Sequence, residues 1–202
     1  MSTPTGYFED MYARSSDPWS FATRWYDARK HALTADSLTR RRYRSGFEPG
    51  CSTGMLTARL AERCDRLLSV DAVPAAVATA AQHLAAFPHV TVRAASMPAD
   101  WPDETFDLIV LSELGYYFDD HDLTTLIDRA VGSLEPGGDL VAVHWRRPVD
   151  EHARPGDEVH ARIAAAPGLA RQARHEEPDF LLEVYTRTPP EAFSVAQREG
   201  LA

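Results

Sequence analysis

The stretch FEPGCSTG, residues 47–54, follows a predicted strand at residues 43–48 and leads into a predicted helix at residues 54–63. Open parallel sheets bind their ligands beyond the carboxyl ends of the strands. Gly50 and Gly54 let the backbone take positive φ values and pass close to a ligand. The helix that follows offers unpaired N–H groups at its start. The stretch therefore predicts a ligand-binding turn at the edge of an α/β sheet.

A second strand is predicted at residues 66–71, and it ends on Asp71. A carboxylate at this place can accept both hydroxyl groups of a ribose. The turn lacks the third glycine of a dinucleotide fingerprint and the G-K-[ST] sequence of a P-loop. Glu48 would repel a pyrophosphate and suits a ligand with an ammonium group. We therefore expect a ribose-containing ligand other than a dinucleotide.

The rest of the chain alternates short apolar runs with helical patterns. This order predicts an α/β, Rossmann-like, seven-stranded and mostly parallel sheet with helices on both faces and an antiparallel edge hairpin. Further helices are predicted at residues 20–42, 74–86 and 120–134, and further strands at 89–95, 105–113 and 139–146. The edge hairpin is expected at 170–177 and 180–188, between a mixed segment at 151–170 and a short terminal helix. We expect one domain over residues 1–202, divided into an N-terminal helical cap or lid (1–42), a ligand-binding core (43–147) and a substrate-side segment (148–202).

Composition limits the classes of partner. The chain has 202 residues and a net charge of −9, and an acidic chain repels the phosphate backbone of nucleic acid. No apolar run is long enough to cross a membrane. The two cysteines, Cys51 and Cys64, are too few for a disulfide scaffold or a usual zinc site. We expect a cytoplasmic protein that acts on a small molecule without a metal ion.

Four segments resemble, in the same order, the motifs of one enzyme family. EPGCSTG resembles motif I of the class I S-adenosylmethionine-dependent methyltransferases, with Ser52 in place of the middle glycine. LLSVDAVPAAVATAA resembles motif II, FDLIVLSELGYYF resembles motif IV, and LEPGGDLVAVHW resembles the turn and strand that follow. YFEDMYARSSDPWSFATRWYDARKHALTADSL and AVHWRRP look like the nodulation protein S (NodS)-like branch. Members of that branch resemble N-methyltransferases that act on deacetylated amino sugars.

The resemblance implies S-adenosylmethionine as the cofactor. Glu48 would orient the turn and face the methionine ammonium, and Asp71 would bind the ribose. The full set that the resemblance assigns to the cofactor is Glu48, Gly50, Cys51, Gly54, Asp71, Ala72, Val73, Ser96, Met97, Ser112 and Glu113.

Three residues of the N-terminal region are further candidates. Trp19 is expected to help form a lid over the cofactor, with Tyr26 and Lys30 one helical turn apart on the first long helix. Simple packing of that helix on the sheet explains Trp19 and Tyr26 equally well. A surface position is the commoner place for a lysine such as Lys30.

The acceptor side offers several titratable groups. His144 ends the fifth strand and is a candidate base, and Glu113 is a candidate base or ammonium ligand. The alternatives are a buried, hydrogen-bonded histidine and a solvated carboxylate. The set expected to contact the acceptor is Tyr26, Lys30, Tyr116, Tyr117, His144 and Arg146, although Arg146 also suits a surface position. His152 and His160 match no metal-ligand spacing and are interpreted as solvated or substrate-contacting side chains.

The leading hypothesis is transfer of a methyl group from S-adenosylmethionine to the amine nitrogen of a deacetylated amino sugar or a similar metabolite. An O-methyltransferase of a small natural product is the nearest alternative. A nicotinamide-dependent oxidoreductase is disfavoured by the missing third glycine. A non-catalytic cofactor-binding protein remains a further alternative, because Ser52 and Ser96 depart from the family pattern.

Overall fold

One sheet of seven strands forms the centre of the molecule. The computed structural model describes all residues 1–202. The strands lie in the order β3-β2-β1-β4-β5-β7-β6, and their bounds are β1 (Gly46–Pro49), β2 (Leu67–Asp71), β3 (Val90–Ala94), β4 (Phe106–Ser112), β5 (Leu134–Trp145), β6 (Leu169–Glu176) and β7 (Phe180–Arg187). All neighbours pair in parallel except β7, which runs antiparallel to both β5 and β6. The predicted Rossmann-like sheet with an antiparallel edge hairpin is confirmed.

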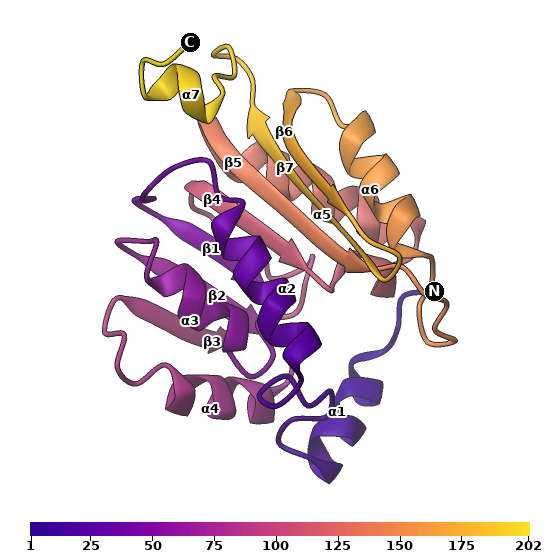
Figure 1. Cartoon of the computed structure of the whole chain (residues 1–202). Coiled ribbons are helices and arrows are strands. Elements are labelled where there is room, and N and C mark those ends of the chain that lie inside the picture. The colour runs from indigo at the N-terminus through magenta and orange to yellow at the C-terminus, as the bar shows by residue number, and fades with distance from the viewer.

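Helices cover both faces of this sheet (Figure 1). The helices α2 (Trp25–Asp36), α3 (Met55–Ala61) and α4 (Pro74–His83) lie on one face, and α5 (Asp120–Ser133) and α6 (Gly156–Ala165) lie on the other. Each face has its own apolar core: Leu60 of α3 packs in one, and Leu126 of α5 packs in the other. All seven residues of β4 are buried because this central strand is covered from both sides.

Local sequence explains where several helices begin. Pro74 stands at the start of α4, where its missing N–H costs no hydrogen bond. Asp119 caps α5 and accepts hydrogen bonds from the backbone N–H groups of His121 and Asp122. Gly54 is the N-cap of α3 and has φ +81°. These signals place the helix starts next to the ends of the strands that precede them.

Some predicted boundaries are wrong. The helix expected at residues 20–42 is shorter, because α2 spans only Trp25–Asp36 and its N-cap is Arg24. The strand expected from residue 139 begins at Leu134. Two helices were not predicted, α1 (Thr5–Arg14) and α6. Neither has a side-chain cap, since each follows a proline, Pro4 or Pro155.

The last element is the short helix α7 (Val195–Arg198), at the end of the molecule opposite the N-terminus (Figure 1). The longest helix has 14 residues, and none is long and apolar enough to cross a membrane.

Candidate functional site

The glycine-containing turn lies between β1 and α3, near the middle of the sheet. Gly50 has φ +76° and Ser52 has φ +51°, so both take the left-handed conformation that favours glycine. The N–H groups of Gly50 and Cys51 donate to the carbonyl oxygen of Val70, at 2.7 and 2.9 Å. The turn is thereby fixed to β2. It follows β1, and the strand order reverses between β1 and β4, which is where sheets of this kind bind their ligands.

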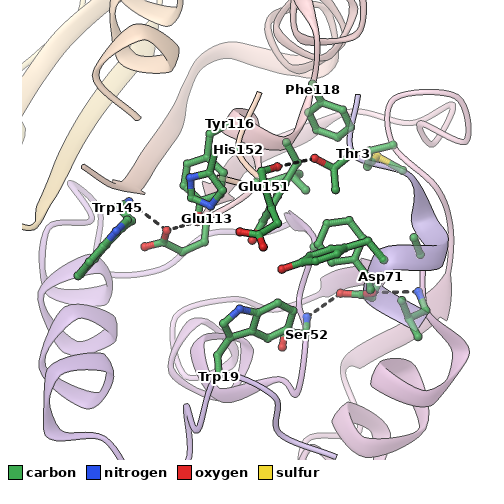
Figure 2. A pocket seen from close by; sticks show the side chains of 18 of the residues that line it. Thr3, Trp19, Ser52, Asp71, Glu113, Tyr116, Phe118, Trp145, Glu151 and His152 are labelled. Carbon is green, nitrogen blue, oxygen red and sulfur yellow. Dashed lines mark hydrogen bonds between the residues drawn. The ribbon is translucent and has the colours of Figure 1, made fainter. Parts of the chain in front are cut away.

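Asp71 sits at the end of β2 and faces the same space (Figure 2). Its carboxylate accepts hydrogen bonds from the N–H groups of Ser52 at 2.9 Å and Val73 at 3.0 Å. Burial raises the pKa of Asp71, and the backbone donors oppose that rise. Each carboxylate oxygen accepts one backbone bond, and its second lone pair remains for a ligand hydroxyl.

A cavity of about 840 Å³ opens at the carboxyl ends of the strands. Its walls come from the ends of β2, β3, β4 and β5, and from the N-terminal segment. Twelve of the residues predicted from the sequence line it: Trp19, Tyr26, Lys30, Gly50, Asp71, Ala72, Val73, Ser96, Met97, Glu113, Tyr116 and Tyr117. This volume is within the range of small-molecule and cofactor sites.

Glu113 is the most constrained side chain on the cavity wall. It follows β4 with φ +52°, and its carboxylate accepts hydrogen bonds from Lys30 Nζ at 2.7 Å, from the Trp145 N–H at 3.0 Å and from the Tyr116 hydroxyl. Burial raises the pKa of Glu113, but the charge and hydrogen bond of Lys30 and the hydroxyl of Tyr116 outweigh burial and lower it to about 2. A carboxylate is therefore held ionised beside the cavity (Figure 2).

Lys30 is buried, contrary to the surface position that the sequence favoured. Only 3% of its side chain is exposed, and it lies between Glu113 and Asp27, whose carboxylate is 3.3 Å away. Burial lowers the pKa of Lys30, and the two carboxylates outweigh that effect and raise it. The Lys30 ammonium also lies 5.0 Å from the centre of the Tyr26 ring. This buried cation fixes Glu113 and Asp27 at one end of the cavity.

The position of His144 does not suit a base that touches the acceptor. Its side chain is 0% exposed and does not line the cavity. Its Nε2 accepts a hydrogen bond from the N–H of Gly115 at 3.1 Å, and its Nδ1 lies 3.2 Å from Nε2 of His160. Burial and the neighbouring His160 lower the pKa of His144 to about 3. The alternative interpretation, a buried and hydrogen-bonded histidine, describes what the structure contains.

His160 continues this buried chain of hydrogen bonds. Its Nδ1 lies 2.8 Å from a carboxylate oxygen of Glu183 on β7. Since Nε2 of His144 accepts from a backbone N–H, its proton is on Nδ1 and points to His160. The two rings therefore connect the segment that carries Tyr116 to the edge hairpin, and His160 is neither solvated nor on the cavity wall.

Five further predicted residues do not line the cavity. Glu48 is buried, and its carboxylate accepts hydrogen bonds from the hydroxyls of Thr57 at 2.6 Å and Ser69 at 3.0 Å. Burial raises the pKa of Glu48 to about 7, although both hydroxyls oppose the rise. This arrangement suits a role in orienting the turn, and it does not bring the carboxylate to the wall. The others that do not line the cavity are Cys51, Gly54, Ser112 and Arg146.

These four residues have other partners or positions. Burial raises the pKa of the Cys51 thiol, which leaves it a protonated packing group. Gly54 packs on α4, where an added Cβ would meet Ala80 at 3.2 Å. Ser112 is a buried residue of β4. Arg146 pairs with Asp157 at 2.7 Å and with Glu176 at 3.0 Å, so its guanidinium is committed to the protein surface.

The N-terminal segment, which was expected to form a cap or lid, lines the cavity through further residues that the predicted site did not include, among them Thr3 and Tyr12. The Tyr12 hydroxyl on α1 lies 2.6 Å from the Ser52 hydroxyl of the glycine-containing turn. Tyr12 and Trp19 meet edge to face, with ring centres 5.7 Å apart. Thr3 bonds through its N–H to the Tyr117 carbonyl at 2.8 Å, and through its hydroxyl to the Glu151 carbonyl at 2.8 Å. The segment thus spans the cavity from the turn to the far wall (Figures 1 and 2).

The residues present suit S-adenosylmethionine. Asp71 offers carboxylate oxygens to a ribose, and the apolar side chains of Val73 and Met97 line the same cavity. Gly50 and Ser52 bring the backbone of the turn to the wall, and the ionised Glu113 lines the same cavity. The donor set therefore matches a ligand with a ribose, a flat base and a charged tail.

Comparison with known proteins identifies the family. The family profile described as Nodulation protein S (NodS) matches residues 9–152. Nodulation protein S of Sinorhizobium fredii is 30% identical over 129 residues, which are 63% of this chain and 60% of that protein. The matched part therefore spans less than two thirds of this curated relative.

Solved structures give the same result. The N-methyltransferase NodS from Bradyrhizobium japonicum, in complex with S-adenosyl-L-homocysteine, superposes with a TM-score of 0.79 at 28% identity over 91% of this chain and 98% of that chain. A Pseudomonas syringae protein described as a candidate methyltransferase is 48% identical, with a TM-score of 0.72 over 81% of this chain and 100% of that one. The chain therefore belongs to the nodulation protein S (NodS) family and has the class I S-adenosylmethionine-dependent methyltransferase fold that its motifs predicted.

Proposed function

We propose that this chain is an S-adenosylmethionine-dependent N-methyltransferase whose acceptor is the amine of a deacetylated amino sugar or a similar small metabolite. The observation that carries the proposal is Glu113, an ionised carboxylate held on the cavity wall at the end of β4. A fixed carboxylate suits an acceptor that arrives as an ammonium ion. S-adenosylmethionine supplies an activated methyl group, so the protein's own task is to position the acceptor and exclude water.

The charge of the cavity supports an amine over a neutral or anionic acceptor. Six carboxylates line it, from Asp27, Asp71, Glu113, Asp122, Glu151 and Asp179, against two basic side chains, from Arg24 and Lys30. Such an excess of negative charge attracts cations and repels anions. The buried Tyr26 hydroxyl has no hydrogen-bond partner and offers a polar contact on the same wall.

The N-terminal segment gives the site a way to exclude water. Its contacts through Thr3, Tyr12 and Trp19 cover the space between the turn and Tyr117. Closure over a reacting centre strengthens electrostatic contacts and prevents loss of the activated group to water.

The cofactor is tested first, by calorimetric titration with S-adenosylhomocysteine and with NAD as the control. We expect binding of the first in the micromolar range and none of the second. Binding of NAD alone would support the oxidoreductase alternative and overturn the proposal.

The acceptor is tested with a matched pair of sugars, chitobiose with free amines and its di-N-acetylated form. We expect release of S-adenosylhomocysteine with the free amine only. Equal turnover of both sugars would favour O-methylation, since both carry the same hydroxyl groups. Cofactor binding without turnover of any amine in a wider panel would favour a non-catalytic protein.

A further inference from the structure

His152, which the sequence predicts to be a solvated or substrate-contacting side chain, lies on the cavity wall. Its ring stacks on that of Tyr116, with centres 3.7 Å apart and planes 12° apart, and it meets Tyr117 edge to face at 5.0 Å. The ring is half-buried and lines the cavity. Its contacts are aromatic, so both nitrogens remain free to bind a ligand.

The backbone holds this ring in place. The N–H of His152 donates to the Val149 carbonyl at 3.1 Å, and the N–H of the next residue, Ala153, donates to the Tyr116 carbonyl at 2.8 Å. Thr3 donates to the carbonyl of the preceding residue, Glu151. His152 is thereby fixed to the segment after β4 and to the N-terminal wall (Figure 2).

Tyr116 connects His152 to Glu113. The Tyr116 hydroxyl donates to the Glu113 carboxylate, while the face of the same ring supports His152. Figure 2 shows the three side chains together at one end of the cavity. An ammonium group bound at Glu113 would therefore lie close to a free imidazole nitrogen.

We propose that His152 is the catalytic base, which takes a proton from the acceptor amine bound at Glu113 before methyl transfer. The proposal rests on the proposed N-methyltransferase function and assigns a residue to its proton-transfer step. The imidazole nitrogen binds one proton of the ammonium group, and the N–H electron pair stays on the amine nitrogen as its lone pair. The nitrogen then forms a bond to the methyl carbon as the carbon–sulfur bond breaks, and that electron pair leaves with sulfur. S-adenosylhomocysteine and a methylated ammonium ion result, and the imidazolium returns its proton to water.

The other titratable groups at the site suit this step less well. The pKa of Glu113, lowered to about 2, makes it a strong anchor for a cation and a weak acceptor of protons. His144 is closed off behind Gly115. Burial lowers the pKa of His152, and the charges of Glu113 and Glu151 oppose this, so the ring is neutral at pH 7. The remaining titratable groups near the ring are Tyr116, Tyr117 and His144.

The test compares His152→Phe and His152→Asn with the wild type, using chitobiose as the acceptor. Phenylalanine keeps the stack on Tyr116 and removes the base, so it separates proton transfer from packing. We expect kcat to fall by about 100-fold or more in both variants, the usual contribution of a general base, with the affinity for S-adenosylhomocysteine within twofold of wild type. His121→Asn is the matched control, since His121 is exposed on α5, and it should keep wild-type turnover.

The pH profile distinguishes a base from a structural residue. The wild-type kcat should fall below the imidazole pKa, and His152→Phe should lack that acidic limb. If His152→Phe has the kcat of the wild type and keeps the acidic limb of the pH profile, the assignment of His152 as the base is overturned. The proposed function would remain intact. If the wild type binds S-adenosylhomocysteine but methylates no chitobiose, the assignment of His152 is tested by binding instead. The ¹⁵N resonances of the histidine rings are then followed by NMR while glucosamine is added as the probe. Glucosamine should shift the His152 ring resonances in the S-adenosylhomocysteine complex, and unshifted resonances would overturn the proposal.

Discussion

At the residue scale, Asp71 should control cofactor affinity. Its carboxylate faces the cavity and also holds the N–H groups of Ser52 and Val73. Hydrogen bonds to a charged group contribute about 1.5–3 kcal/mol each, so Asp71→Ala should weaken S-adenosylhomocysteine binding by about 10- to 100-fold. Calorimetric titration measures this, with circular dichroism to show that the variant folds. Unchanged affinity would contradict the ribose assignment.

Glu113→Gln should act on the acceptor instead. The amide keeps the size of the side chain and removes the charge that attracts an ammonium ion. We expect kcat/KM for chitobiose to fall at least tenfold while the affinity for S-adenosylhomocysteine stays near wild type. Steady-state kinetics measures the first quantity and calorimetry the second. Equal losses in both would mean that Glu113 binds the cofactor, as its place in the predicted cofactor set also allows.

Sequence identified the strand ends but not the direction of each side chain there. Asp71 and Glu113 follow buried runs, so their place at the carboxyl edge was predictable. Neighbouring residues in a strand point to opposite faces, and only the structure shows that Trp145 meets the cavity while His144 points into the core. The predicted base, His144, is therefore the sequence neighbour of Trp145, which is the residue that reaches the cavity.

At the scale of elements, α1 should regulate the release of the cofactor. Its one hydrogen bond to the glycine-containing turn joins Tyr12 and Ser52. A hydrogen bond contributes about 0.5–1.5 kcal/mol, so Tyr12→Phe should speed dissociation of S-adenosylhomocysteine by about two- to tenfold in stopped-flow measurements. Ser52→Ala removes the same bond from the other side, and the double variant should be no faster than either single one. Additive effects would show that the two hydroxyls act separately.

The elements that sequence missed are those that depend on distant contacts. Neither α1 nor α6 has a side-chain cap, and residues far along the chain hold each of them: Tyr12 of α1 bonds to Ser52, and Val159 and Ile163 of α6 pack in the same apolar core as α5. Gly156 opens α6 where an added Cβ would meet the Trp145 carbonyl at 2.3 Å, so the helix requires glycine at this contact with β5. By contrast, the strands and α3 to α5 follow apolar periodicity and signals at the helix starts, which are Gly54 at α3, Pro74 at α4 and the Asp119 cap of α5. Local signals therefore predicted the core, and long-range contacts determined the cavity wall.

At the scale of the whole molecule, the buried chain from Gly115 through His144 and His160 to Glu183 links the centre of the sheet to its edge hairpin. Burial raises the pKa of Glu183, but hydrogen bonds from His160 and Tyr185 outweigh it and lower the pKa to about 2. The stability that Glu183 contributes is present above its unfolded pKa and is lost as the pH falls toward 2. This network should therefore make the fold sensitive to acid.

Because of His144, the loss of folding stability in acid should begin at a milder pH. Its pKa is lowered from 6.5 to about 3 by burial and by His160, so between these values the unfolded chain binds a proton that the folded chain does not. Stability is therefore lost as the pH falls through this window, by about 1.4 kcal/mol per pH unit for one proton. Urea unfolding at pH 6, 5 and 4 measures how steeply the free energy of unfolding changes with pH. His144→Gln places an amide near the position of Nε2 and removes the titrating group. The free energy of unfolding of this variant should therefore fall less steeply with pH, by about 1.4 kcal/mol per pH unit. The comparison isolates His144 because the opposing Glu48, whose pKa is raised to about 7, titrates in both proteins. Equal slopes would mean that His144 does not change its protonation on unfolding.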